Sequence, residues 1–417
     1  MGWRSRHLRP ELTTYLIGAA LSAFAVLVVV AAADAFEASL FGLRLWFDAV
    51  LPALLPFFVL SEVLAAYGVI HFVAVLLEPL MRPVFNIPGA GGFAFAMGLV
   101  SGYPLGAIIT ARLCRERLIN AVEGERLVSL ANTADPLFMA GVVAAGFFAI
   151  PEAGGILTAS HYLAVLVVGW IGAFHDRHAP ATPALEAHSR EPLLRRAATA
   201  MVKARLSDGR PFGQVLGDAV KTSMVSMLLV GGTIMLFSVL LQVLEQLGVV
   251  PLVGRLAASV LGLVGLEPSL AEATVRGLLE ITNGSQAASQ AQASLSARLA
   301  VASFVIGWAG ASVHAQVAAV TEKTGIRMGP YIRARLLHGL LAALFTLAMV
   351  ALDLGPRLPT LALPHGTDGG SAWSLATLVW RTRLGLLFVG LTLVGLAAGS
   401  AVRQAARLVT APWGLRR

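Results

Sequence analysis

The stretch Ile281-Thr282-Asn283-Gly284-Ser285-Gln286 decides the fold, together with an earlier stretch, Ser101-Gly102-Tyr103-Pro104-Leu105-Gly106. Each is a short polar segment containing Gly or Pro, and each is set between apolar segments. Such a break leaves backbone N–H and C=O groups that lipid cannot bond, so it is tolerated only against protein or a water-filled cavity. Because Asn-Gly is also a common turn pair, an ordinary loop between helices is the simpler interpretation of either stretch alone.

The two stretches occupy corresponding places in two halves of the chain. An offset of 180 residues aligns Ser101 with Ile281 and Pro104 with Gly284, without a gap between them. Corresponding Gly/Pro-interrupted segments in two halves are typical of secondary transporters, whose solute site lies near the middle of the membrane. The pattern therefore predicts two inverted repeats.

The composition indicates a polytopic membrane protein. Of 417 residues, 57% are hydrophobic and 13% are charged, and the mean hydropathy is +0.77. The net charge is +8, but the basic residues lie in loops beside apolar segments, which is typical of topology signals. We therefore expect no nucleic-acid partner. The one cysteine, Cys114, excludes an internal disulfide and a Cys-rich metal site.

The charge pattern also predicts the topology. Arg4, Arg6 and Arg9 precede the first apolar segment, which is too long for a signal-peptide core, so the N-terminus is expected in the cytoplasm. One span then precedes the first repeat, which places the two repeats antiparallel and both termini inside. The predicted divisions are 1–35 (N-terminal transmembrane helix), 36–174 (first repeat), 175–210 (cytoplasmic linker), 211–335 (inverted second repeat) and 336–417 (C-terminal transmembrane helices).

Each repeat is expected to contain a re-entrant helical hairpin followed by an unwound transmembrane helix. The predicted hairpin tips are residues 101–104 and 282–285, and the predicted unwound segments are 132–136 and 307–312. In the second repeat, an interfacial helix near 211–220 is expected to precede a separate span from about 223 to 244.

After the second repeat, Arg333 and Arg335 are expected at the cytoplasmic surface. Two further spans are predicted, over about 336–351 and 384–402.

Helices broken inside the membrane expose N–H groups and a positive dipole end, which bind anions. If the four breaks meet, they form one polar chamber that favours an anion. The candidate solute-binding residues lie at or beside the breaks and are Ser101, Gly102, Tyr103, Asn132, Thr133, Thr282, Asn283, Gly284, Ser285, Gln286, Trp308 and Ser312.

Two carboxylates at these depths, Asp135 and Glu280, are candidates for binding a coupling ion, a proton or sodium. Asp135 precedes Pro136, so a helix-capping role is the structural alternative. No metalloprotease, intramembrane-protease or P-loop motif occurs in the sequence. We therefore expect no enzymatic activity, no cofactor and no bound metal.

Three stretches carry a resemblance to a known family. They are LPFFVLSEVLAAYGVIHFVAVLLEPLMRPVFNIPGAGGFAFAMGLVSGYPLGA at 55–107, ANTADPLFM at 131–139 and GLLEITNGSQAAS at 277–289. With these, the chain resembles the sporulation integral membrane protein YlbJ (SpoVV) family from about residue 40 to 350. That family carries a nucleoside-recognition (gate) domain and is distantly similar to concentrative nucleoside transporters, which have two re-entrant hairpins and two unwound helices.

The resemblance implies a bacterial, multi-pass membrane protein that moves dipicolinate across the outer forespore membrane during sporulation. Dipicolinate is a rigid aromatic dianion, which agrees with a chamber of helix N-termini. A nucleoside or related metabolite would use the same polar breaks, and a non-transporting sporulation scaffold would not need them. The coupling ion, the direction of transport and a homo-oligomeric state are left open by the sequence.

Overall fold

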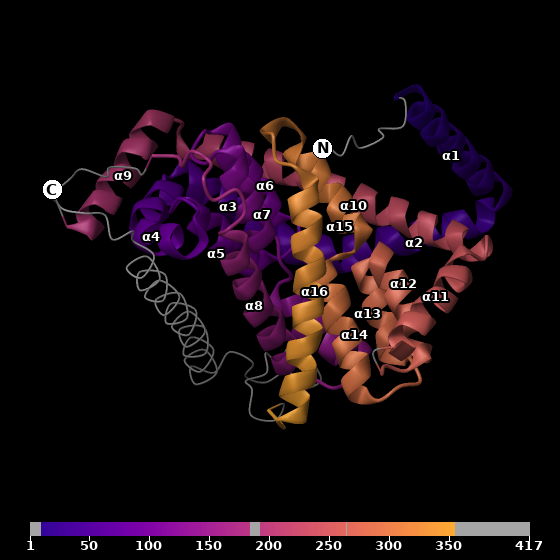
Figure 1. Cartoon of the computed structure of the whole chain (residues 1–417). Coiled ribbons are helices and arrows are strands. Elements are labelled where there is room, and N and C mark those ends of the chain that lie inside the picture. The colour runs from indigo at the N-terminus through magenta and orange to yellow at the C-terminus, as the bar shows by residue number, and fades with distance from the viewer. Residues whose placement is uncertain (1–9, 184–191, 264, 355–417) are drawn as a thin grey trace, which may run out of the picture.

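The computed structural model describes residues 10–183, 192–263 and 265–354, which are almost entirely helical (Figure 1). No strand occurs within these ranges. Four of the described helices or helix runs are long and apolar enough to cross a membrane, and the number rises to six if each of two bent helix pairs counts as one span. The four are α8 (Ala153–Gly172), α10 (Phe212–Gln246), Leu295–Thr324 and α16 (Met328–Ala351). The prediction of an all-α polytopic membrane protein is confirmed.

The chain begins with two bent pairs of helices. Helix α1 (Pro10–Val30) meets α2 (Ala32–Leu45) at 98°. A π-helical segment, η1 (Trp46–Val50), then leads into α3 (Leu51–Ala66), which meets α4 (Val69–Phe85) at 83°.

The first repeat continues with a hairpin and a broken helix. Hairpin 1 consists of α5 (Gly91–Ser101) and α6 (Leu105–Arg115), and broken helix 1 consists of α7 (Ala121–Ala131) and the π-helical η2 (Leu137–Phe147). A capping box between Asn120 and Glu123 starts α7. Helix α8 follows and packs against η2 and α7.

The second repeat follows the same order. After α10 come α11 (Val249–Leu263) and a short turn, η3 (Pro268–Leu270). Hairpin 2 consists of α12 (Ala271–Leu279) and α13 (Ile281–Gln290). Broken helix 2 consists of α14 (Leu295–Trp308) and α15 (Gly310–Thr321), and a turn, η4 (Glu322–Thr324), leads to α16. Each half therefore places a hairpin before a broken helix.

Contacts between the halves show that the two broken helices run in opposite directions. At one end of the molecule, Arg327, which follows broken helix 2, bonds Glu125 near the start of broken helix 1. At the other end, Arg298 near the start of broken helix 2 lies over the ring of Phe148, just after broken helix 1. In Figure 1 hairpin 1 accordingly lies above hairpin 2. The predicted inverted arrangement agrees with these contacts.

Hairpin 1 packs against α7 backbone to backbone. A Cβ atom at Gly98 would lie 1.8 Å from the carbonyl oxygen of Ala131, and one at Gly106 would lie 2.0 Å from the same oxygen. Only glycine allows this approach, which is the usual way in which membrane helices come close. The two arms therefore hold the end of α7 between them, immediately before its break.

Three sequence predictions about helix bounds are wrong. Residues 282–285 are not a tip, because they lie inside α13, and the helical path of hairpin 2 breaks at Glu280 instead. Helix α10 is continuous over 35 residues, so residues 211–220 are not a separate interfacial helix. Helix α16 begins at Met328 and not near residue 336, and Arg335, predicted at the cytoplasmic surface, is buried in it.

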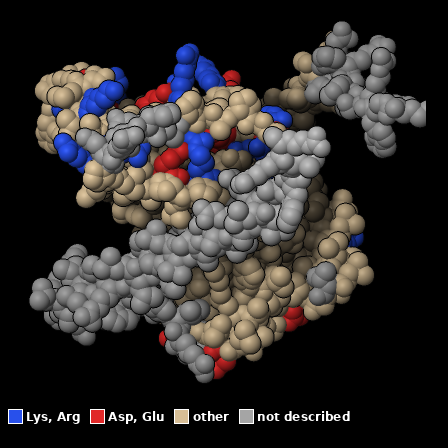
Figure 2. Space-filling view, turned by 60° about the vertical axis from the view of Figure 1, so that its left-hand side comes forward, with Lys and Arg blue, Asp and Glu red and all other residues tan. Residues whose placement is uncertain are grey.

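The predicted linker also contains a helix, α9 (Leu193–Asp208), which packs against α4. The predicted span 384–402 lies outside the described residues. In Figure 2 most of the visible Lys and Arg side chains gather at the upper end of the molecule, above a broad surface of other residues. This distribution is typical of a membrane protein whose basic end faces the cytoplasm.

Candidate functional site

A cavity of about 520 Å³ lies where the breaks of the two halves meet. Its walls include Ser101 and Tyr103 of hairpin 1, Asp135 of broken helix 1, and Glu280 of hairpin 2. Broken helix 2 contributes Ser312 and Gln316, and the remaining lining side chains are largely apolar. A concave, mostly apolar space with a few convergent polar groups is typical of a small-molecule site.

The tip of hairpin 1 is shaped by Gly102. Its φ of +73° is unfavourable for residues with a Cβ atom, and a Cβ there would lie 2.4 Å from Oδ2 of Asp135. The tip therefore rests directly on the carboxylate of the unwound segment. Beside it, the Ser101 hydroxyl is buried, lines the cavity and has no hydrogen-bond partner among the described residues.

Tyr103 connects hairpin 1 to the second half. Its side chain lines the cavity, and its hydroxyl donates to the carbonyl of Ile306 over 2.9 Å. Ile306 lies in the last turn of α14, just before that helix breaks. A tip from the first repeat is thus joined to the broken helix of the second.

The unwound segment of broken helix 1 is held by polar side chains. The Asp135 carboxylate accepts from the backbone N–H of Phe138 over 2.9 Å, which caps η2. Thr133 Oγ1 lies 2.6 Å from His161 Nε2, and Asn132 Nδ2 donates to the Tyr331 hydroxyl over 2.8 Å. Of the polar side chains Asn132, Thr133 and Asp135, only that of Asp135 belongs to a residue that lines the cavity.

Glu280 performs the corresponding capping role in hairpin 2. It is the one extended residue between the two arms, with φ −146° and ψ 127°. Its carboxylate accepts from the backbone N–H of Asn283 over 2.8 Å and so caps α13. Glu280 is 3% exposed, whereas Asp135 is half-buried.

Broken helix 2 breaks at Ala309 and Gly310, both with φ of +76°. The adjacent Trp308 donates from Nε1 to the carbonyl of Leu278 over 3.1 Å. Trp308 therefore braces hairpin 2 and is not among the residues that line the cavity.

These capping contacts change the electrostatics expected from the sequence. The N–H groups of Phe138 and Asn283 already bond carboxylates of their own segments. Asp135 and Glu280 are the charged residues in the cavity wall, which contains no Lys or Arg among the described residues. The wall thus presents carboxylates as well as hydroxyls to a solute.

The structure brings six of the fourteen predicted site residues to the cavity. These six are Ser101, Tyr103, Asp135, Glu280, Thr282 and Ser312. The other eight are not lining residues, and they are Gly102, Asn132, Thr133, Asn283, Gly284, Ser285, Gln286 and Trp308. Gly102 and Trp308 support residues beside the cavity, and the buried Ser285 hydroxyl has no hydrogen-bond partner among the described residues.

Sequence reasoning missed several functional candidates on α8 and α16. His161, Tyr331, Arg335 and His338 are almost completely buried. They lie behind the unwound segment, where His338 Nε2 donates to the His161 carbonyl over 2.9 Å. Helices α8 and α16 bring these side chains together. On α16, Arg335 lies four residues after Tyr331 and three before His338, so the three side chains share one face of the helix.

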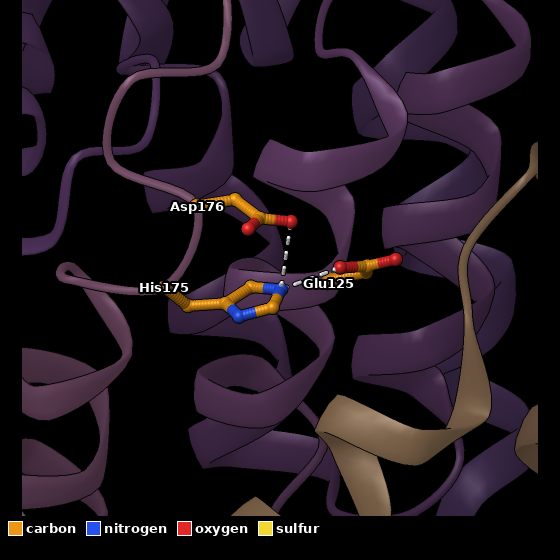
Figure 3. A group of neighbouring side chains, drawn as sticks. All are labelled: Glu125, His175 and Asp176. Carbon is orange, nitrogen blue, oxygen red and sulfur yellow. Dashed lines mark hydrogen bonds and ion pairs between the residues drawn. The ribbon is translucent and has the colours of Figure 1, made fainter. Parts of the chain in front are cut away.

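A second polar cluster lies at the basic end of the molecule (Figure 3). His175 stands between the carboxylates of Glu125 and Asp176, and the ligand-type atoms of the three lie within 4.8 Å of one another. Such a set could hold a metal ion. However, the Arg327 guanidinium bonds Glu125 over 2.6 Å and Asp176 over 2.7 Å, so a cation already occupies this position. We interpret the cluster as an ion-pair clasp between the two halves.

The charge state of this clasp follows from its contacts. Burial would raise the pKa of Glu125, but hydrogen bonds from Arg327 and His175 outweigh burial and hold that pKa below its usual value. Hydrogen bonds to the carboxylates of Glu125 and Asp176 raise the pKa of Arg327. The clasp therefore stays charged at neutral pH.

Comparison with known proteins identifies the family. The chain is 43% identical over 320 residues to the sporulation integral membrane protein YlbJ of Bacillus subtilis (strain 168), covering 75% of this chain and 77% of that protein. The chain belongs to the YlbJ family. Residues 47–169 of this YlbJ-family chain also match the Gate family model, described as nucleoside recognition.

Two solved structures of CNTnw are similar in shape. For the inward-facing, substrate-bound state the TM-score is 0.40 at 15% identity, covering 83% of this chain and 88% of CNTnw. For an outward-facing state of a doubly substituted CNTnw variant the TM-score is 0.36 at 15% identity, covering 85% and 88%.

Proposed function

We propose that this chain is a secondary transporter that moves a small solute through the cavity between its two repeats. The observation that carries the proposal is the meeting of both hairpins and both broken helices on one cavity of about 520 Å³. Broken backbone at membrane depth is tolerated where it lines a cavity, and opposed repeats around such a site allow alternating access. A non-transporting scaffold would have no use for this arrangement.

The contacts between the halves suggest how access could alternate. Near the cavity, Tyr103 and Ile306 join hairpin 1 to broken helix 2. At the basic end, Arg327 and Glu125 join the halves again through the clasp. Release of the clasp would open the cytoplasmic side, while the contact of Arg298 with the ring of Phe148 holds the opposite side.

We propose dipicolinate as the solute, carried across the outer forespore membrane, with both termini of the transporter in the cytoplasm. Support comes from family membership, since the Bacillus subtilis relative is a sporulation protein. The cavity also suits a flat ring, because Tyr103 and Phe138 stand in an otherwise largely apolar wall.

A dianion in this cavity needs compensation for Asp135 and Glu280. Like charges about 4 Å apart repel by about 4 kcal/mol at an effective dielectric constant of 20. We therefore propose that protons or sodium ions bind at these carboxylates and travel with the anion. The two carboxylates would then serve both as helix caps and as coupling sites.

The same carboxylates favour a second candidate, a nucleoside or related neutral metabolite. Hydroxyl and amide groups of such a solute would donate to Asp135 and Glu280 without any charge to compensate. The nucleoside-recognition match over residues 47–169 supports this alternative.

Uptake by proteoliposomes tests the proposal and separates the candidates. Purified protein would be reconstituted, given an inward proton or sodium gradient, and supplied with labelled dipicolinate or labelled uridine. We expect gradient-dependent dipicolinate accumulation that excess unlabelled dipicolinate abolishes and excess uridine does not. Uridine accumulation alone would select the nucleoside candidate. Uptake of neither solute above protein-free liposomes would contradict both.

A further inference from the structure

Arg335 occupies an unexpected position in this fold. The positive-inside pattern predicts it at the cytoplasmic surface, but it lies inside α16 and is 0% exposed. A buried arginine in a membrane protein is energetically costly and usually serves a function. Its contacts indicate which one.

The Arg335 guanidinium holds the last turn of α7. Nη1 donates to the carbonyl of Asn132 over 2.9 Å, and Nη2 donates to the carbonyl of Ser129. These oxygens belong to the C-terminal end of a half-helix, whose negative dipole end attracts a cation. Arg335 thus satisfies carbonyls that the break leaves without helical partners.

The charge of Arg335 has no direct counter-ion. Of the described residues, no Asp or Glu side chain forms an ion pair with it, and the ring centroid of Tyr331 lies 5.7 Å from its Cζ. The nearest break carries a carboxylate, Asp135, three residues beyond Asn132. Asp135 lines the cavity, so the unwound segment that Arg335 holds at Asn132 is part of the cavity wall.

We propose that Arg335 is a positioning and specificity-determining residue of the cavity. Its guanidinium fixes the broken end of α7, and its charge offsets the carboxylates of the wall, so that the cavity admits an anion. This inference rests on the proposed function for the identity of the solute, but the potential that Arg335 sets can be measured without any solute.

Charged thiol reagents provide that measurement. Ser101→Cys would be placed in a Cys114→Ser background, and its modification rates by an anionic and a cationic methanethiosulfonate of similar size would be compared. The ratio of the two rates reports the potential at the cavity wall. We expect Arg335→Gln to lower the anionic-to-cationic ratio about tenfold, whereas Arg335→Lys keeps the charge and leaves the ratio within about twofold.

Tyr331→Phe is the matched control, because it alters the same surroundings without removing charge. If Arg335→Gln is not recovered folded, the comparison moves to an Asp135→Asn background. There Arg335→Gln/Asp135→Asn should show a ratio about tenfold below that of Asp135→Asn alone. Equal ratios in each pair would overturn the proposal.

The reagents are not transported solutes, so this result is independent of the uptake assay. A charge-dependent ratio in a protein that does not transport dipicolinate would reject the proposed solute and retain the role of Arg335. Dipicolinate uptake combined with an unchanged ratio of modification rates would retain the proposed solute and reject the role of Arg335.

Discussion

The two hairpins have the same place in their repeats but bring different chemistry to the cavity. Hairpin 1 turns through a three-residue break without a carboxylate, and the acidic group beside it, Asp135, comes from the unwound helix. Hairpin 2 breaks at one residue, and that residue is itself the acid, Glu280. Broken helix 2 breaks at Ala309 and Gly310. The topology is repeated, whereas the ionisable groups are not placed equivalently.

This difference teaches that each half has its own means of holding a break open. At the break of the first half, glycine and a capping aspartate share the task with the buried Arg335, which reaches the break from α16. In the second, one glutamate caps the helix and Trp308 braces the arm from outside. The halves should therefore respond differently to matched substitutions.

The largest difference is expected in packing. Gly98→Ala would drive a methyl group into the Ala131 carbonyl, which cannot move aside, so we expect a cost of at least about 3 kcal/mol and little folded protein. Gly277→Ala instead meets the side chain of Val305, at 2.2 Å from Cγ2. Val305→Ala should rescue Gly277→Ala, as judged by the monodisperse yield in detergent. Full yield of Gly98→Ala would contradict the backbone contact.

The next comparison concerns the two carboxylates. Asp135→Asn and Glu280→Gln each keep a capping oxygen and remove the charge, so both variants should fold. If the carboxylates bind the coupling ion, each variant should lose gradient-driven accumulation by about tenfold or more, and the more deeply buried Glu280 should have the larger effect. Alanine at Asp135 should cost about 1 kcal/mol of stability through the lost cap.

Accumulation and binding are measured separately in these variants. Solute binding in detergent should persist in Asp135→Asn, since the carboxylate is proposed to hold the ion. Wild-type accumulation in the double Asn/Gln variant, with unchanged dependence on the gradient, would rule out the coupling role and leave both residues as caps.

A smaller effect is expected at the hydroxyls of the hairpins. Ser101 and Ser285 are both buried without a hydrogen-bond partner among the described residues, but only Ser101 lines the cavity. Ser101→Ala should therefore weaken solute binding about fivefold, the value of one hydrogen bond, while Ser285→Ala should stay within about twofold. Isothermal titration of both variants tests this, and a stronger effect at Ser285 would move the site toward α13.

The smallest expected effect is a pH dependence of stability from the clasp. Because the folded-state pKa of Glu125 is depressed, its contribution is present above the ordinary carboxylate pKa and is lost as pH falls through the folded value. The thermal midpoint in detergent should therefore decrease on acidification below about pH 4.5. Arg327→Gln should reduce this dependence, and Arg333→Gln, on an exposed arginine outside the clasp, is the control. Identical pH profiles for wild type and Arg327→Gln would contradict the assignment.

The sequence predicted the breaks better than their inner geometry. Polar segments with Gly or Pro mark three of the four breaks correctly, because backbone without a helical path must leave such a trace among apolar residues. The prediction of the break in hairpin 2 failed at Asn283 and Gly284, because this common turn pair lies inside a helix. Gly284 is needed there for packing, since a Cβ would lie 2.2 Å from Cα of Gly277 on the other arm.

The buried polar groups could not be predicted from local pattern. Arg335 follows Arg327 and Arg333 in a basic stretch, a pattern that predicts a cytoplasmic position. Its hydrogen-bond partners Ser129 and Asn132, however, lie about 200 residues away in the chain. Contacts at such separation depend on how the repeats dock. For the same reason, Trp308 and Asn132 lie beside the cavity and not in its wall.

The most direct test of the central claim is protection of both hairpins by one solute. Ser101→Cys and Thr282→Cys would each be made in a Cys114→Ser background, and modification by a small thiol reagent would be followed against dipicolinate concentration. A single cavity shared by the two repeats predicts that both cysteines are protected, with the same half-protecting concentration. Protection of one cysteine alone, or half-protecting concentrations that differ clearly, would contradict a shared site.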